Sequence, residues 1–264
     1  MKIGVTQIIL GATSLTDTLA LCEEAGYDAV ELVFAENKDL RVDMSMGELA
    51  EVAAVCRSAG VEIVSVMAQP KERGNLLSTD AGERALCVAR LRRSIEIAGA
   101  LGVGTTLLHP GQLPIDAHYG AAWNYMRDAL AETASFAADQ GVAIGVENVW
   151  NKFLLSPLEA ERFVDEVGSE WVGIYLDTAN MMAYGYPEQW IRQLGVERIK
   201  GVHFKDYVRR EHRFVNLLDG DTDWCGVMEA LRDVGYNAWA IHEVGGSHEE
   251  LVDLGGRMRQ IVAM

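Results

Sequence analysis

The sequence predicts an α/β protein, a single (β/α)₈ TIM barrel over residues 1–264, from three observations. An Ala/Leu/Glu-rich segment, a glycine and a short β-branched run recur along the chain, as in "LALCEEAGYDAVELVF" and "TASFAADQGVAIGVEN". The β-branched runs are almost continuously apolar, which is typical of parallel strands buried on both faces. The alternation occurs eight times with no break in composition, and 264 residues is a normal length for one such barrel.

Eight strands are expected, each followed by a helix. The expected strands are 2–9, 29–34, 61–68, 104–109, 143–148, 172–177, 199–204 and 238–243. The expected helices lie near 16–25, 45–59, 80–101, 118–140, 157–167, 187–194, 222–234 and 247–262. Polar residues that suit helix N-caps begin several of them: Thr16, Ser45, Thr79, Ser156 and Ser247. Glycines that suit left-handed helix ends follow five of them: Gly26, Gly60, Gly102, Gly141 and Gly235.

A doubly wound open sheet is the structural alternative. That fold places a glycine-rich phosphate-binding turn after the first strand. The corresponding stretch here, "ILGATS", matches that turn poorly, so the barrel is favoured.

The charge of the chain bears on its partners. Asp and Glu number 39 against 23 Lys and Arg, which gives a formal net charge of −16. There is no basic surplus to displace counterions from phosphates, so nucleic acid is not an expected partner. No apolar run approaches the length of a membrane span, and no membrane partner is expected. The balance suits a soluble enzyme that acts on small molecules or binds metal ions.

The cysteines and the first residues predict a reducing, cytoplasmic setting. Cys22, Cys56, Cys87 and Cys225 are widely spaced, and three of them fall in helix-like segments, so buried free thiols are expected. The start, "MKIGVTQIIL", is broken by polar residues and has no small-residue cleavage site, so it is interpreted as a first strand and not a signal peptide.

Polar residues end the last four expected strands, in "VEN", "LDTAN", "VHFKD" and "IHEV". They place Glu147, Asp177, His203 and Glu243 at equivalent heights on the rim where barrel enzymes carry their active sites. A lone Asp there is also typical of a cap or turn, and a lone His of a structural residue. Four in register predict instead a mixed oxygen and nitrogen site for one divalent cation, such as Mn²⁺, Mg²⁺, Co²⁺ or Zn²⁺.

These segments resemble the metal-site segments of the xylose-isomerase-like sugar (phosphate) isomerase/epimerase superfamily. The nearest branches in motif are the L-xylulose-5-phosphate 3-epimerases and the ketose 3-epimerases. The resemblance implies one divalent metal, with Mn or Mg favoured, held by Glu147, Asp177, His203 and Glu243. It also implies catalytic roles for Glu147 and Glu243, which would transfer protons on opposite faces of a ketose or ketose phosphate through a metal-stabilised enediolate.

The match departs from the ketose 3-epimerase pattern at two positions. Asn180 stands where those enzymes usually carry a His, and Phe153 where they carry a substrate-binding Glu. "DTAN" looks more like the "D-x-G-N" segment of the L-xylulose-5-phosphate branch. On the same alignment Arg213 matches a family Arg, while Leu218 replaces a usual Gly, so a differently shaped loop and a different substrate are left open.

Several further residues are candidates for substrate binding: His109, Asn180, Lys205, Arg213 and Trp150. Lys205 and Arg213 belong to a basic cluster with Arg209 and Arg210 that suits either a clamp for a phosphate or polar sugar tail, or a solvated face. Lys205 lies two residues beyond His203 and should point the same way. Glu31 is expected to bond a substrate hydroxyl or a neighbouring strand end. His242 is expected to point outward and to be structural.

Other functions fit the same pattern less well. A metal-dependent dehydratase of a polyol or keto sugar would use the same metal and proton abstraction but expel a hydroxyl. An endonuclease IV-like DNA-repair enzyme would need additional His and Asp ligands, including one where Asn180 stands, and is disfavoured by the charge of −16. A non-catalytic sugar-binding barrel would not need two Glu on the metal. By analogy with relatives, a homo-oligomer is open.

Overall fold

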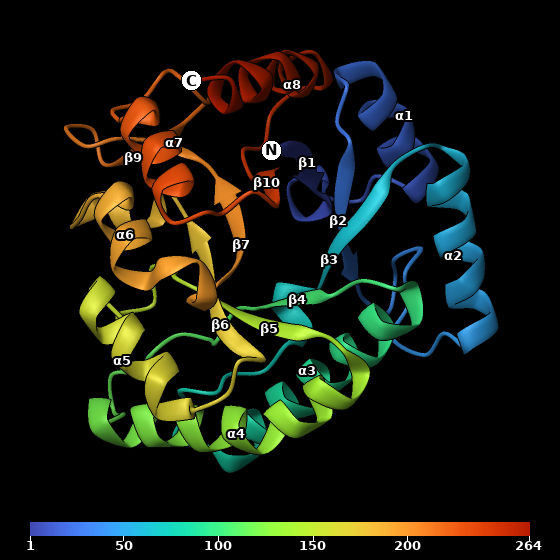
Figure 1. Cartoon of the computed structure of the whole chain (residues 1–264). Coiled ribbons are helices and arrows are strands. Elements are labelled where there is room, and N and C mark those ends of the chain that lie inside the picture. Colours follow the sequence, from blue (N-terminus) through green and yellow to red (C-terminus); the bar gives the residue numbers. More distant parts are fainter.

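The computed structural model, which describes residues 1–264, is a closed barrel of eight parallel strands inside a ring of eight helices (Figure 1). The order around the barrel is β1, β10, β7, β6, β5, β4, β3, β2. The barrel strands are β1 (Lys2–Thr6), β2 (Ala29–Phe34), β3 (Glu62–Ala68), β4 (Thr105–Leu108), β5 (Ala143–Glu147), β6 (Val172–Asp177), β7 (Ile199–Phe204) and β10 (Trp239–His242). The predicted fold class is confirmed.

The helices follow the strands as the repeated pattern predicts. They are α1 (Leu15–Ala25), α2 (Met46–Ser58), α3 (Ala81–Leu101), α4 (Tyr119–Gln140), α5 (Pro157–Val167), α6 (Pro187–Arg198), α7 (Trp224–Asp233) and α8 (His248–Val262). The five glycines proposed as helix ends all have φ between 66° and 80°, a left-handed region that favours glycine.

Two of the five expected N-caps are wrong. Ser45, Ser156 and Ser247 cap their helices through the side chain. At the other two helices the caps are Ser14, which accepts from the Asp17 amide, and Asp80, which accepts from two amides. Thr16 lies inside α1 and Thr79 precedes the cap of α3. Ser14 and Asp80 can bond the same unpaired backbone amides of the first helical turn as the threonines near them. Only the backbone conformation decides which of the neighbouring residues caps the helix.

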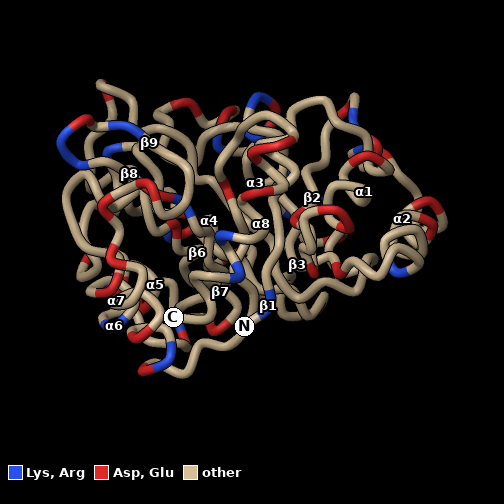
Figure 2. Tube along the Cα trace, turned by 90° about the horizontal axis from the view of Figure 1, so that it is seen from above, with Lys and Arg blue, Asp and Glu red and all other residues tan.

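The loops hold short elements that the pattern did not predict, among them a 3₁₀ turn after β1 and a hairpin after β7. The first strand ends at Thr6, three residues early, because the Thr6 hydroxyl accepts from the Ile8 amide and starts a 3₁₀ turn, η1 (Gln7–Leu10). After β7 the chain forms an antiparallel hairpin, β8 (Asp206–Val208) and β9 (Arg213–Val215), which is not part of the barrel. Figure 2 shows this hairpin on the side of the molecule opposite the N-terminus, with Lys and Arg gathered on it.

A single aromatic side chain fills much of the barrel interior. Tyr175 on β6 packs inside the barrel with apolar residues of β2, β3 and β4 (Val33, Met67 and Leu107), apart from the large core between strands and helices. Gly145 and Gly201 on the two flanking strands leave room for it. A Cβ at Gly201 would lie 2.4 Å from Cε2 of Tyr175. The polar residues at the strand ends are therefore supported by a packed layer of side chains inside the barrel.

All four cysteines are free, and Cys22, Cys56 and Cys87 are buried as expected, whereas Cys225 is exposed. None of the helices combines the length and the apolar character that crossing a bilayer requires.

Candidate metal centre

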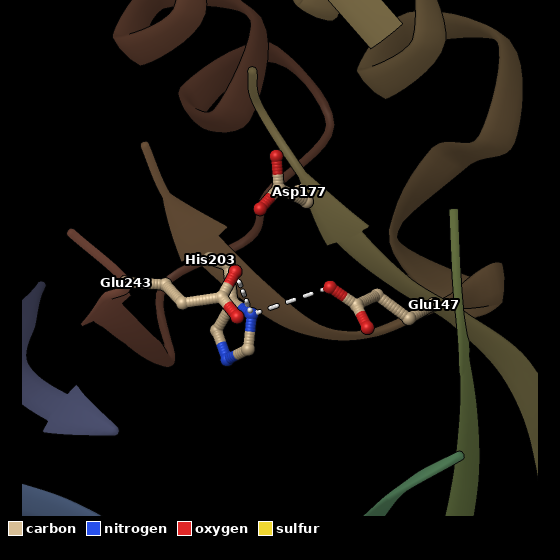
Figure 3. Close-up of side chains that lie close together, drawn as sticks. All are labelled: Glu147, Asp177, His203 and Glu243. Carbon is tan, nitrogen blue, oxygen red and sulfur yellow. Dashed lines mark ion pairs between the residues drawn. The ribbon is translucent and has the colours of Figure 1, made fainter. Parts of the chain in front are cut away.

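Four polar side chains converge where the strands of one half of the barrel end (Figure 3). Glu147 and Asp177 are the last residues of β5 and β6, His203 is the penultimate residue of β7, and Glu243 follows β10. One ligand atom from each lies within 4.8 Å of all the others. The four residues chosen from the strand ends are thus brought together, as predicted.

The two glutamates approach the centre from opposite sides, with the imidazole between them (Figure 3). Nδ1 of His203 lies 3.3 Å from Oε2 of Glu243 and 3.8 Å from Oε1 of Glu147. Three of the four residues are buried, and the Glu243 side chain is 13% exposed. A small group entering the mouth would therefore have a carboxylate on each flank.

The Asp177 side chain is held in place by the backbone around it. Its Oδ1 accepts from the amides of Ala179 and Asn180, at 2.8 and 2.6 Å. Asn148 ties the two strand ends together, since its amide group bonds both the backbone N–H and the carbonyl of Asp177. Oδ2 is left buried with no hydrogen-bond partner. The second oxygen forms no hydrogen bond and has the Lys205 ammonium 3.8 Å away, so it can bind a ligand.

The crowding of carboxylates perturbs the protonation of the group. Burial and the charge of Glu243 raise the pKa of Glu147, and burial raises the pKa of Asp177 to about 7. Burial also opposes ionisation of Glu243, but the charges of Lys205 and His203 outweigh it and lower the pKa of Glu243. Burial disfavours charge on His203, yet Glu31 and Glu243 raise its pKa well above the ordinary value.

The donor set fits a divalent cation. Three carboxylates and one imidazole are the ligands that suit Mn²⁺, Mg²⁺ or Zn²⁺, and cysteine is absent from the group. Asp177 Oδ2 and His203 Nδ1 are both buried without a hydrogen-bond partner, which is costly unless something else meets them. The only ammonium at the cluster is that of Lys205, 3.2 Å from Glu243 and 3.8 Å from Asp177.

Lys205 is the best placed of the substrate-binding candidates. Its Nζ also lies 4.4 Å from the centre of the Phe214 ring on β9, so the hairpin forms one wall of the mouth. The nearby acids outweigh burial and raise the pKa of Lys205. The side chain therefore stays a cation beside the four converging residues.

The remaining candidates are spread around the rim. Nδ1 of His109 accepts from the Gly111 amide at 3.1 Å. The Asn180 side chain donates to the Asn148 carbonyl, and the half-exposed Trp150 donates to the Asn180 carbonyl. Arg213 lies on the hairpin with its side chain 59% exposed and pairs with Glu211. Their roles in substrate binding stay predictions.

The basic cluster seen in the sequence is divided in the structure. Arg209 donates to the carbonyls of Met182 and Gly185 and lies over the Tyr186 ring, which ties the hairpin to the loop after β6. Arg209 is thus engaged by the loop after β6 and Arg213 by Glu211. The clamp for a phosphate or polar sugar tail stays a prediction.

Sequence reasoning missed Arg73, in the loop after β3. The Arg73 side chain is half-buried beside His109, with no ion pair or side-chain hydrogen bond. Burial lowers the pKa of His109 to about 3, and the charge of Arg73 contributes to that shift. No motif marked it, since a single Arg between Glu72 and Gly74 in a loop carries no periodic or spacing signal.

A model of the xylose isomerase-like TIM barrel family matches residues 19–261 of the chain. The chain belongs to this family. Among curated proteins it is similar to an L-ribulose-5-phosphate 3-epimerase of Escherichia coli (strain SMS-3-5 / SECEC), 26% identical over 226 residues that cover 83% of this chain and 78% of that protein.

Solved structures share the fold over the whole chain. A D-tagatose 3-epimerase-like protein superposes with a TM-score of 0.84 at 23% identity, covering 100% of this chain and 97% of that one. An L-ribulose 3-epimerase superposes with a TM-score of 0.82, also at 23% identity, covering 100% and 94%. The family that the strand-end motifs indicated is confirmed.

Proposed function

We propose that this protein is a divalent-metal-dependent isomerase or epimerase of a ketose or ketose phosphate. The observation that carries the proposal is the convergence of four ligand atoms within 4.8 Å, with two glutamates facing each other across the centre (Figure 3). The L-ribulose-5-phosphate 3-epimerase and the L-ribulose 3-epimerase to which the chain is similar support the same class of substrate.

Glu147, Asp177, His203 and Glu243 would hold the cation, with Mn²⁺ or Mg²⁺ favoured because three of the four donors are hard carboxylate oxygens. When bound, the cation supplies Lewis acidity to the carbonyl and neighbouring hydroxyl of the sugar. Oδ1 of Asp177 is held by two amide hydrogen bonds and Oδ2 is buried without one, so its role would be to bind the cation.

The two glutamates would carry the proton transfers. One carboxylate removes the proton from the carbon beside the carbonyl. The electron pair of that C–H bond forms a C=C bond, and the π pair of the carbonyl moves onto its oxygen to give an enediolate. The other glutamate, protonated, returns a proton to the opposite face of the same carbon, which inverts it. Delivery to the neighbouring carbon would instead move the carbonyl and give an isomer.

Lys205 would interact with the carbonyl or hydroxyl oxygen of the sugar and would not transfer the carbon-bound proton. Its ammonium is close to Glu243 and Asp177 and is 18% exposed, so it can meet a substrate oxygen at the open side of the centre. A fixed cation stabilises negative charge that develops on that oxygen, since the surrounding site is poorly solvated.

The test is NMR of the metal-loaded protein in D₂O with a panel of ketoses and ketose phosphates. Deuterium uptake at a carbon beside the carbonyl would identify both the substrate and the proton transfer. Glu243→Gln should abolish turnover while substrate binding stays measurable. Unchanged turnover in that variant, or activity that persists after the divalent ions are removed, would contradict the mechanism.

A further inference from the structure

The imidazole of His203 is bonded, on the side away from the metal centre, by a carboxylate from across the barrel. Glu31 on β2 has its Oε1 3.1 Å from Nε2 of His203. Strands β2 and β7 are not neighbours in the barrel order, so this contact crosses the interior. Both residues are completely buried. The Thr6 hydroxyl donates to the same oxygen of Glu31 at 2.7 Å, which fixes the carboxylate.

This contact decides which nitrogen of His203 faces the cation. An ionised carboxylate only accepts hydrogen bonds, so the nitrogen that faces Glu31 must carry a proton. A histidine binds a metal in its neutral form, which has a single N–H, so in that form the lone pair is on Nδ1. Nδ1 is the nitrogen that faces Glu147 and Glu243, and it is buried with no hydrogen-bond partner. Glu31 thus turns the ligand nitrogen toward the centre.

Packing removes the remaining freedom of the ring. Tyr175, which fills the barrel below the mouth, contacts the His203 ring edge to face at 4.7 Å between centroids and 60° between planes. Because Glu31 bonds Nε2, a flip of the ring about the Cβ–Cγ bond would exchange Nε2 with Cε1 and place a C–H against the Glu31 carboxylate. That arrangement would lose a buried, charge-assisted hydrogen bond.

We propose that Glu31 is a positioning residue for the metal centre: by accepting the Nε2 proton of His203 it presents the Nδ1 lone pair to the cation and so sets metal affinity. This rests on the proposed function, which requires a divalent cation at the four strand-end residues. Carboxylates that orient a ligating histidine have this effect in metal sites generally.

The first measurement is Mn²⁺ binding by calorimetry to the purified, metal-stripped protein. Glu31→Gln keeps nearly the same shape but removes the charge that enforces the Nε2 proton, and it should weaken Mn²⁺ binding by about 10- to 100-fold. Thr106→Val is the matched control. The Thr106 hydroxyl is equally buried in the barrel wall and donates to the Val66 carbonyl at 2.7 Å, but it does not touch His203. Its Mn²⁺ affinity should equal that of the wild type.

A second pair of variants tests the same link without touching the Glu31 charge. Thr6→Val removes the hydroxyl that fixes Glu31 and should weaken Mn²⁺ binding by a few-fold, whereas Thr6→Ser keeps a hydroxyl and should restore it. Nitrogen-15 NMR of the imidazoles in the Zn²⁺-loaded wild type should show the proton of His203 on Nε2. In Glu31→Gln the exchange of that proton with water should be faster.

The outcomes separate the two proposals. Failure of the wild type to bind Mn²⁺ or Zn²⁺ would overturn the proposed function and this inference together. Equal Mn²⁺ affinities for wild type, Glu31→Gln and Thr6→Val would overturn only the role of Glu31, as would a proton found on Nδ1 in the Zn²⁺-loaded wild type.

Discussion

Two histidines of the same rim have opposite electrostatic surroundings. His203, at the end of β7, lies among Glu31, Glu147 and Glu243, and the charges of Glu31 and Glu243 outweigh burial to raise its pKa. His109, just after β4, lies beside Arg73, and burial with that positive charge lowers its pKa to about 3. The mouth of the barrel thus has two different halves. One half is acidic and suits a cation. The other half, around β3 and β4, contains the guanidinium of Arg73, which forms no ion pair or side-chain hydrogen bond within the protein. Residue type alone does not assign a histidine its role; the charges around it do.

The largest difference between the two halves should appear on removing each imidazole. His203→Ala removes a candidate ligand and leaves three carboxylates facing one another, so we expect turnover to fall by at least about 10³-fold and metal binding to be lost at micromolar metal. His109→Gln should leave metal affinity unchanged and raise KM by about 10-fold, the cost of roughly one hydrogen bond to substrate. Calorimetry with Mn²⁺ and steady-state kinetics on both variants check this. Equal metal affinities in the two variants would contradict the assignment of His203, but not His109, to the metal centre.

Lys205 tests whether the acidic half needs a fixed cation besides the metal. Lys205→Met keeps an unbranched side chain of similar length but removes the ammonium that lies 3.2 Å from Glu243 and over the Phe214 ring. We expect kcat to fall about 10- to 100-fold, which is typical of losing one group that stabilises developing charge. Metal titrations run alongside distinguish this from a changed metal site. A rise in KM with kcat unchanged would assign Lys205 to substrate binding alone.

The packing of Tyr175 below the acidic half can be disturbed without changing any of the four candidate metal ligands. In Gly201→Ala the new methyl would overlap the Tyr175 ring, and the free energy of unfolding should fall by about 1–3 kcal/mol. Gly104→Ala, before β4, is the control, because no atom lies within 4 Å of its Cβ position. We expect that control to change stability by less than about 0.5 kcal/mol. Urea unfolding followed by circular dichroism measures both.

In the half around β3 and β4, the lowered pKa of His109 should make the free energy of unfolding depend on pH. Between an ordinary pKa near 6.5 and the folded value of about 3, the unfolded chain binds a proton at His109 that the folded protein does not. The free energy of unfolding of the wild type should therefore fall relative to that of His109→Gln as the pH drops through this window, by at most about 1.4 kcal/mol per pH unit. Arg73→Met should raise the pKa of His109 partway, since burial remains. NMR measures the pKa of His109 in that variant. An unchanged pKa would contradict the contribution of the Arg73 charge to the shift.

Arg213 should give the smallest effect. Its exposed ion pair with Glu211 contributes little to stability, so Arg213→Met should shift the free energy of unfolding by less than about 0.5 kcal/mol. The same variant tests the predicted clamp. A rise in KM for a ketose phosphate but not for the matching ketose would support a phosphate contact, and equal KM changes would argue against one.

Much of the fold could be predicted because it depends on periodic signals. The β-branched runs and the glycines after the helices located every barrel strand and helix, with boundary errors of a few residues such as the early end of β1 at Thr6. The hairpin β8–β9 escaped because its two three-residue strands carry no such period. The four ligand candidates were found because each is a strongly polar residue at the end of an apolar strand, and parallel strands of a barrel end on one face.

What the sequence determined by itself was the barrel, its family and the quartet of Glu147, Asp177, His203 and Glu243, because each depends on neighbours in the chain and on strand periodicity. Lys205 followed from the same periodicity, but tertiary structure alone brought two further residues to the two histidines of the rim. Glu31 meets His203 across 172 residues of sequence, and Arg73 comes beside His109 from a loop without a pattern. Arg209 and Arg213, close in sequence, are turned to separate partners. Such contacts depend on the direction of single side chains in the closed barrel, and local sequence does not encode that direction.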